Sequence, residues 1–377
     1  MISAHHHKRP SFLDARSLVF WVGVLLFGYG LTQVGPLFGM VKRDQPAVVA
    51  LSAVIWGLYA LLFSLIIYRL ETLQRRSPVT MLGAFLWGAV IVTGIAAGGG
   101  NEINEIVAKV LPSDMQDWVP AIAAPLVEEP LKMLGVLALA FIPAVKIDSA
   151  LDGLYYGLFV GLGFEVTEGI LYGASAAALA GSAVTGVVAS FVLRGIVGGL
   201  WSHPTYTGIT GAGVGYFFGS GASAAKRWLV MSGSLLAAMI LHGLFDSPLL
   251  QQDNPVLSTV VKGVPAFVLL LVLLRIARKR ERDVFERVGG TQIVSNLVSH
   301  DELKTLLTKR DRRKARRSLR KTHGFAAAHA MRRLQRSQIE FVATVAEDGP
   351  DSERALSYAT DIAEDRRVLA EVIEESS

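Results

Sequence analysis

Hydrophobic stretches long enough to cross a lipid bilayer follow one another up to residue 275 and are separated by short polar segments. A bilayer core of about 30 Å needs roughly 20 apolar residues in a helix. The pattern predicts membrane-spanning helices at residues 17–41, 47–68, 79–98, 119–142, 149–174, 183–222, 228–250 and 256–275. The polar, acidic stretch 100–118 predicts a short amphipathic helix or a loop outside the membrane. The expected fold is therefore all-α, a polytopic transmembrane helix bundle of about eight spans.

The distribution of lysine and arginine decides how often the long segment 183–222 crosses the membrane. These residues are enriched in short cytoplasmic loops. If the segment crosses once, the basic clusters lie on the side of both termini, and only Lys42 and Arg43 lie opposite. If it crosses twice, the basic C-terminal tail lies outside. We therefore expect eight spans, both termini cytoplasmic, and a kink or re-entrant element around residues 203–204, where Pro204 removes a backbone donor.

The segment 276–377 is charged and forms a separate tail. It contains the basic runs ARKRER and KRDRRKARRSLRK, ends acidic, and shows helical patterning that predicts one or two amphipathic helices. A basic run next to a membrane span favours contact with anionic lipid. The near absence of aromatic residues from the run argues against nucleic acid as a partner. The chain thus divides into a cytoplasmic lead at 1–16, a transmembrane bundle at 17–275 and a cytoplasmic tail at 276–377.

Composition agrees with a membrane protein and limits the available chemistry. The 377 residues are 51% hydrophobic and 18% charged, and the mean hydropathy is +0.43, which is too apolar for a soluble domain of this size. The chain has no cysteine, which excludes disulfides, thiol nucleophiles and thiolate metal sites. The basic N-terminus enters the first span without a small-residue cleavage site, as is typical of a cytoplasmic lead and not of a removed signal peptide.

Ionisable residues inside the predicted spans are the candidates for function, because a charge at mid-membrane is costly and is usually paired or functional. LVEEPLK holds two adjacent glutamates and a lysine, and FEVTEGILYG holds two glutamates one helical turn apart. The segment 183–222 adds an arginine and a histidine, and LHGLFDSP adds a histidine and an aspartate. The candidate residues are Glu128, Glu129, Lys132, Glu165, Glu168, Arg194, His203, His242 and Asp246.

The predicted depths of these residues favour one site. In the eight-span topology Glu128, Glu168 and His242 lie about 9–14 Å below the outer surface. Of the eight histidines, only His203 and His242 lie in apolar segments. Structural polar residues need not share a depth, whereas the members of one site must. We therefore expect a single site toward the outer side, with Arg194 paired to one of the glutamates.

Two adjacent carboxylates, a lysine and two imidazoles predict a centre that activates water. Adjacent Glu128 and Glu129 cannot both be ionised in a low dielectric unless paired, and Lys132 can pair with either along one helix face. One of them is then suited to act as a general base, and the histidines are suited to stabilise an oxyanion. The same set could hold zinc, although neither His-x-x-x-His nor H-E-x-x-H spacing is present. We predict no cofactor, with zinc as the alternative.

A proton-coupled transporter or channel is the alternative function, because Glu, His and Lys sets at mid-membrane also form proton relays. Transporters commonly show inverted repeats and paired broken helices. The chain shows one broken segment and no internal repeat. This pattern favours the enzyme over the transporter.

Four motifs between residues 119 and 250 resemble those of the PrsW family of bacterial intramembrane proteases, relatives of the CAAX-processing and bacteriocin-protection membrane proteases. They are EEPLK, DGLYYGLFVGLGFEVTEGILY, an arginine followed by SHPTYTGITGAGVGYFFG, and LHGLFDS. The resemblance implies an intramembrane endopeptidase of the bacterial cytoplasmic membrane, which cleaves a membrane-anchored protein near the outer side. In PrsW itself this is the first cut in an anti-sigma factor.

The resemblance also implies a role for each candidate residue. The residues matching catalytic positions are Glu128, Glu129, Glu168, His203 and His242. Those matching or adjoining supporting positions are Lys132, Glu165, Arg194 and Asp246. Glu165 stands where the family more usually has a small residue, so we assign it a supporting role.

Overall fold

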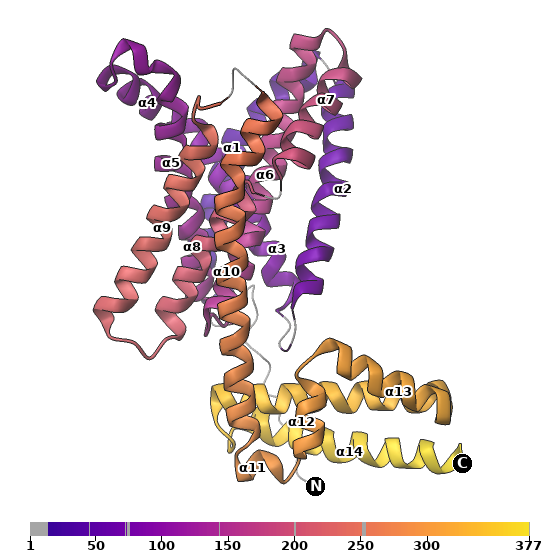
Figure 1. Cartoon of the computed structure of the whole chain (residues 1–377). Coiled ribbons are helices and arrows are strands. Elements are labelled where there is room, and N and C mark those ends of the chain that lie inside the picture. Colours follow the sequence, from indigo (N-terminus) through magenta and orange to yellow (C-terminus); the bar gives the residue numbers. More distant parts are fainter. Residues whose placement is uncertain are drawn as a thin grey trace. The chain divides into compact units, whose positions relative to one another are not determined.

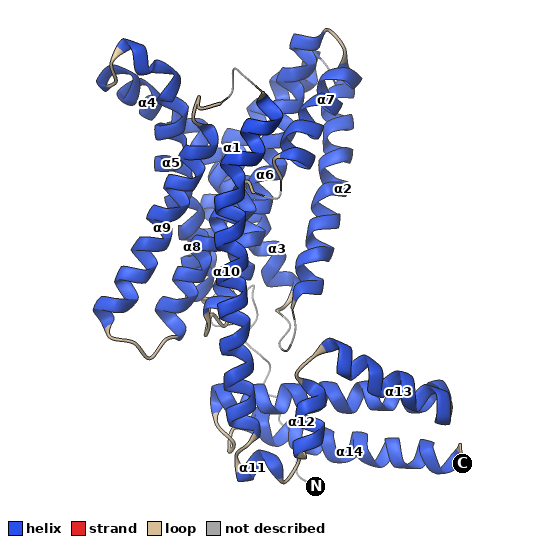
Figure 2. Ribbon diagram, viewed as in Figure 1, coloured by secondary structure: helices blue, strands red, loops and turns tan. Residues whose placement is uncertain are grey.

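The computed structural model describes residues 14–44, 46–71, 73, 76–142, 144–199, 201–250 and 254–376. Over these residues the chain is helical and contains no strand (Figure 2). The predicted all-α fold is confirmed. Most of the predicted N-terminal lead, residues 1–13, lies outside the described residues.

The helices follow one another with short connections (Figure 1). The first part of the chain forms α1 (Leu18–Asp44), α2 (Pro46–Leu70), α3 (Pro78–Leu86), a π-helix (Trp87–Val92), α4 (Thr93–Val110), a 3₁₀-helix (Ser113–Trp118), α5 (Val119–Ala140) and α6 (Ala150–Ala180). The second part forms α7 (Ala183–Phe191), a second π-helix (Val192–Val197), α8 (His203–Gly219), α9 (Ala224–Asp246), α10 (Pro255–Gly289), α11 (Gln292–Ser295), α12 (His300–Leu306), α13 (Lys309–Asp348) and α14 (Glu353–Glu375).

Six helices in the described part of the chain are long and apolar enough to cross a membrane. They are Leu18–Gly39, Pro46–Leu70, Pro78–Val110, Ala150–Ala180, Ala224–Asp246 and Pro255–Gly289. Two of the eight predicted spans do not meet the same criteria, for different reasons. Helix α5 carries two glutamates and a lysine, and the segment 183–222 is divided into short helices.

The segment 183–219 passes once along α6, in two pieces. A Cβ added at Gly186 would lie 2.3 Å from Ala177 Cα, and one added at Gly161 would lie 2.3 Å from the His203 carbonyl oxygen. As the chain advances from Gly186 to His203, its contacts on α6 shift from Ala177 back to Gly161. The two segments are therefore antiparallel. The break falls before His203, and Pro204 stands at the start of α8, where its missing N–H costs nothing.

Helix α6 carries two of the candidate glutamates and has well-defined ends. The Ser149 hydroxyl caps its first turn by accepting from the Asp152 amide at 3.2 Å. The Asp152 carboxylate also accepts from Arg76 Nε at 2.9 Å. At the other end Gly181 adopts φ 62°, a left-handed conformation that favours glycine and ends the helix. Local sequence thus fixes the length of this helix.

Close glycine contacts hold α6 against α8, which predicts a stability effect. A Cβ at Gly157 would lie 2.1 Å from the Thr207 carbonyl oxygen, and backbone cannot move aside as a flexible side chain can. We expect Gly157→Ala to lower the free energy of unfolding by about 1–3 kcal/mol. Thermal unfolding in lipid nanodiscs measures this. Gly57→Ala on α2 is the control, because nothing lies within 4 Å of its added Cβ, and equal effects of both variants would contradict the prediction.

The chain divides into two compact units, Met1–Ile67 with Arg76–Arg275, and Tyr68–Arg75 with Ile276–Ser377. The second unit has its own hydrophobic core, which includes Leu73, Val294, Leu303, Val342 and Ile362. The helices predicted for the tail lie within α13 and α14, and α11 and α12 are additional to that prediction. The tail is therefore a folded unit, and Leu73 from the segment between α2 and α3 belongs to its core.

Candidate functional site

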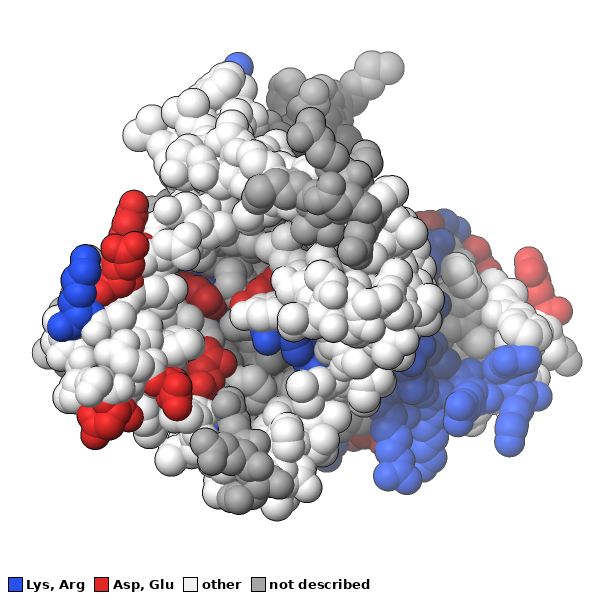
Figure 3. Space-filling model, turned by 90° about the horizontal axis from the view of Figure 1, so that it is seen from above, with Lys and Arg blue, Asp and Glu red and all other residues white. Residues whose placement is uncertain are grey.

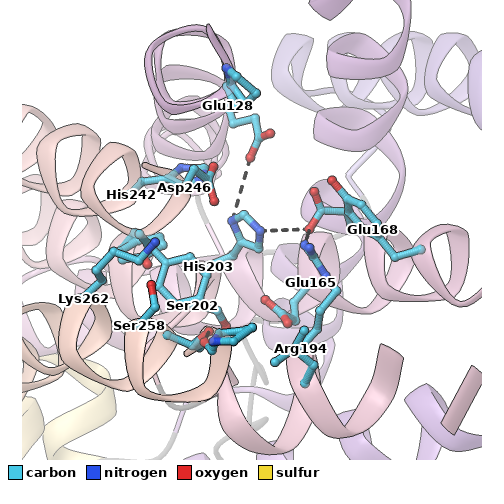
Figure 4. A pocket seen from close by; sticks show the side chains of 18 residues that line it. Glu128, Glu165, Glu168, Arg194, Ser202, His203, His242, Asp246, Ser258 and Lys262 are labelled. Atoms are coloured by element: carbon cyan, nitrogen blue, oxygen red, sulfur yellow. Dashed lines mark hydrogen bonds and ion pairs between the residues drawn. The ribbon is translucent and has the colours of Figure 1, made fainter. Parts of the chain in front are cut away.

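A cavity of about 500 Å³ lies within the first unit, between helices α5, α6, α8, α9 and α10 (Figure 4). The view from above shows a hollow with acidic and basic side chains in its depth (Figure 3). The predicted site residues that line the cavity are Glu128, Glu165, Glu168, Arg194, His203, His242 and Asp246. The other two, Glu129 and Lys132, are fully buried on α5. The structure thus brings all the candidate residues together.

Lys132 connects the two adjacent glutamates to the first histidine. Its Nζ donates to Glu128 Oε2 at 2.8 Å, to Glu129 Oε1 at 2.9 Å and to His203 Nδ1 at 2.9 Å. Spacings of three and four residues on α5 place both carboxylates on the lysine's side of the helix. An ammonium group has three hydrogens and no acceptor, so all three are used. One buried cation therefore offsets the charge of both carboxylates.

The contacts of His203 determine its tautomer. Because the Lys132 ammonium can only donate, His203 Nδ1 accepts, and the ring proton is on Nε2. His203 Nε2 lies 3.0 Å from Glu168 Oε2 and donates a hydrogen bond to it. The same oxygen accepts from Arg194 Nη2 at 2.6 Å. Arg194 thus pairs with Glu168, a partner that the sequence left open between the glutamates, and Glu168 orients the ring of His203.

His242 lies between two carboxylates. Its Nδ1 is 2.9 Å from Glu129 Oε1, and its Nε2 is 3.1 Å from Asp246 Oδ2. Both nitrogens face acceptors, which favours the doubly protonated ring. The ring of Tyr206 stacks on it at a centroid distance of 5.1 Å. Since the His203 ring centroid is 5.0 Å away, the two imidazoles adjoin each other beside the cavity.

The two adjacent glutamates differ in access to the cavity. Glu128 lines it, and its Oε2 lies 3.8 Å from His203 Nδ1 (Figure 4). Glu129 is 0% exposed, its Oε1 contacts both Lys132 and His242, and its Oε2 has no hydrogen-bond partner among the described residues. A molecule in the cavity can reach Glu128, whereas Glu129 holds neighbouring groups in place.

Glu165 lies one helical turn before Glu168 on α6 and also lines the cavity. Its side chain is buried, and its Oε2 has no hydrogen-bond partner within the part of the chain that the structure describes. Within the described residues Glu165 thus has no ion pair like that of Glu168 with Arg194. The supporting role assigned to it stays a prediction.

Lys262 was missed by the sequence analysis. It lies on α10, is buried, and lines the cavity together with Ser258. Its Nζ donates to the Ser247 carbonyl oxygen at 2.7 Å, which ties α10 to the end of α9 beside Asp246. A lysine inside an apolar span is itself a signal of function or pairing, and this signal could have identified it.

Four groups at the site could hold a metal ion. Glu128, Glu129, His203 and His242 each offer a ligand atom, and these atoms all lie within 4.8 Å of one another. Imidazole and carboxylate are ligands that zinc uses in proteins, and the unpartnered Oε2 of Glu129 is a spare acceptor. The donor set therefore fits zinc once His242 Nδ1 has given up its proton. A metal ion and the Lys132 ammonium would compete for the same groups.

Comparison with known protein families identifies a match. The family model described as PrsW family intramembrane metalloprotease matches residues 76–274, more than half of the chain. The matched range contains every candidate site residue. No curated protein and no solved structure gives a significant match.

Proposed function

The chain belongs to the PrsW family of intramembrane metalloproteases, which are hydrolases, and on this premise we propose that it hydrolyses a peptide bond of a membrane-anchored protein at the cavity beside Glu128. The observation that carries the proposal is the position of the Glu128 carboxylate, which lines the cavity while Lys132 binds it at 2.8 Å. A carboxylate that is paired with a buried ammonium and open to a cavity is suited to act as a general base.

Glu128 takes a proton from water as the water oxygen bonds to the carbonyl carbon of the substrate. The developing oxyanion forms beside His203 and His242, where the positive charges of the doubly protonated His242 ring and of Arg194, both lining the cavity, stabilise it. Glu128 then returns the proton to the amine nitrogen as the carbon–nitrogen bond breaks. Lys132, Glu129 and Glu168 hold Glu128 and the two imidazoles in position during both steps.

A zinc ion held by Glu128, Glu129, His203 and His242 would supply a Lewis acid and lower the pKa of a bound water. Two contacts within the chain orient the imidazoles whether or not a metal is bound. Glu168 orients His203 through its Nε2 proton, and Asp246 orients His242 at 3.1 Å. These contacts fix which ring atoms face the cavity.

Glu168→Gln should lower the cleavage rate by about 10- to 100-fold, because His203 Nε2 loses its anionic acceptor and Arg194 its partner. Cleavage of a membrane-anchored reporter by purified protein in lipid measures the rate. Asp114→Asn in the 3₁₀-helix, exposed and outside the cavity, is the control. An unchanged rate in Glu168→Gln would show that His203 needs no such orientation.

The proposed function is tested with a library of membrane-anchored reporters and wild-type protein in lipid vesicles. Cleavage that depends on Glu128 supports the protease. If wild type cleaves no reporter but conducts protons, the transporter alternative replaces it.

We further propose eight crossings of a bacterial cytoplasmic membrane with both termini cytoplasmic and the cavity toward the outer side. The single pass of residues 183–219 along α6 supports this count, with α5 as another crossing. The substrate is then a membrane protein such as an anti-sigma factor. The run KRDRRKARRSLRK in the first half of α13 supports contact of the tail with anionic lipid.

A further inference from the structure

A second cavity of about 640 Å³ adjoins the first along the faces of α4 and α5. The residues that line both cavities are Pro120, Ala124, Glu128 and Tyr172. The two spaces therefore meet at the carboxylate proposed to activate water. We name the second space the α4–α5 groove, and it is lined by Ala96, Ala97, Gly100, Asn101, Asn104, Glu105, Ala108, Gln116, Val119, Pro120, Ala123, Ala124, Val127, Glu128 and Tyr172.

One face of α4 forms a wall of the groove. Ala97, Asn101, Asn104 and Ala108 recur at spacings of three and four residues, so they share this face. Small residues on membrane helices normally let helices pack closely. Here the small residues of α4 line an open groove instead. Two carboxamides, each able to donate and accept hydrogen bonds, stand among them.

Hydrogen bonds of Gln116 shape the end of the groove where α4 meets the 3₁₀-helix. Gln116 Nε2 donates to the carbonyl oxygens of Ala108 at 3.0 Å and Leu111 at 3.1 Å. These bonds fold the 3₁₀-helix back onto the end of α4, the projection near the α4 label in Figure 1. The wall is therefore built by specific contacts before any ligand arrives.

A peptide bond inside an α-helix keeps its carbonyl and amide groups in internal hydrogen bonds. The substrate must be extended where Glu128 reaches it, and its freed backbone groups then need new hydrogen-bond partners. The α4–α5 groove offers such partners next to Glu128.

We propose that the α4–α5 groove binds the substrate polypeptide, in an extended conformation, on one side of the cleaved bond. Asn101 and Asn104 hydrogen-bond to its backbone, and the space over Gly100 and Ala97 receives its side chains. The proposal rests on the proposed protease function, because it takes the cleaved bond to lie at Glu128.

Two neighbouring glycines of α4 provide a matched steric test. Gly100 lines the groove, and nothing lies within 4 Å of an added Cβ there. Gly99 does not line the groove, and its added Cβ meets only Glu102 Oε2, at 3.9 Å. We expect Gly100→Trp to lower kcat/KM for a cleaved reporter about tenfold or more, mainly through KM, and Gly99→Trp to stay within about twofold.

The absence of cysteine allows a second, direct measurement. Asn104→Cys is combined with Glu128→Gln, so that a reporter binds without being cleaved, and single cysteines are placed along the reporter. We expect disulfides from reporter positions on one side of the cleaved bond only. Ile106→Cys, exposed on α4 and outside the groove, is the matched control and should give no such pattern.

The outcomes separate the two proposals. If wild type cleaves no reporter in the library, the proposed protease function fails. The proposal that the groove binds substrate then fails as well. If wild type cleaves and Glu128→Gln does not, the function stands. In that case, equal activity of the two tryptophan variants, together with equal cross-linking of the two cysteine variants, overturns the groove alone. Selective inhibition and one-sided cross-linking support it.

Discussion

Glu128→Gln should reduce peptide-bond cleavage by about 10²- to 10⁴-fold, which is what a general base contributes. The glutamine side chain keeps the volume and an oxygen acceptor for Lys132 but cannot take a proton from water. Because Lys132 retains Glu129 as an ionised partner at 2.9 Å, the fold should persist. Single-turnover cleavage of a membrane-anchored reporter in lipid measures the loss.

Two comparisons make this result specific. Glu102→Gln removes an exposed carboxylate from the same unit outside both cavities, and its cleavage rate should equal that of wild type. Glu129→Gln alters the contacts to both Lys132 and His242, so it should lower the unfolding temperature as well as the rate. A Glu128→Gln variant that retains wild-type cleavage would remove Glu128 from the mechanism.

Most of the ionisable residues at the cavity could be predicted from the sequence because each is an ionisable group in an apolar segment. That signal needs no knowledge of tertiary contacts, since the cost of burying charge selects for pairing or function. The pairing itself could not be predicted. Glu168 and Arg194 are 26 positions apart, and their contact at 2.6 Å depends on where the second π-helix places Arg194 relative to α6. The sequence likewise could not show that Glu128 lines the cavity while Glu129 is buried, because this depends on which of the two neighbours faces the cavity.

The number of spans shows where the hydropathy pattern is weak. The charges that make α5 part of the site also remove it from the helices that qualify by composition, and the break before His203 shortens α8 to 17 residues. The charged candidate residues thus weaken the hydropathy signal of the helix that carries them. The core of the second unit was beyond prediction for another reason. Leu73 joins that core from far away in the sequence, in a segment without periodicity.

Lys132→Met should lower the free energy of unfolding by about 3–5 kcal/mol, the cost of leaving buried charges without a partner. Lys132 is fully buried and is the shared cation of Glu128 and Glu129. The double variant Lys132→Met with Glu129→Gln should recover part of the loss, because it removes one of the uncompensated charges. Thermal unfolding in nanodiscs measures both. A Lys132→Met variant as stable as wild type would contradict the shared-cation role.

Zinc should stabilise Lys132→Met more than it stabilises wild type. In wild type the ammonium occupies three of the groups that a metal would use, at 2.8–2.9 Å. Its removal leaves two carboxylates and two imidazoles within 4.8 Å of one another and without a competing charge. Binding to the folded state raises the unfolding temperature in proportion to the logarithm of ligand concentration. The measurement is the unfolding temperature against zinc concentration for both proteins, and a larger shift for wild type would show that Lys132 assists metal binding instead of competing with it.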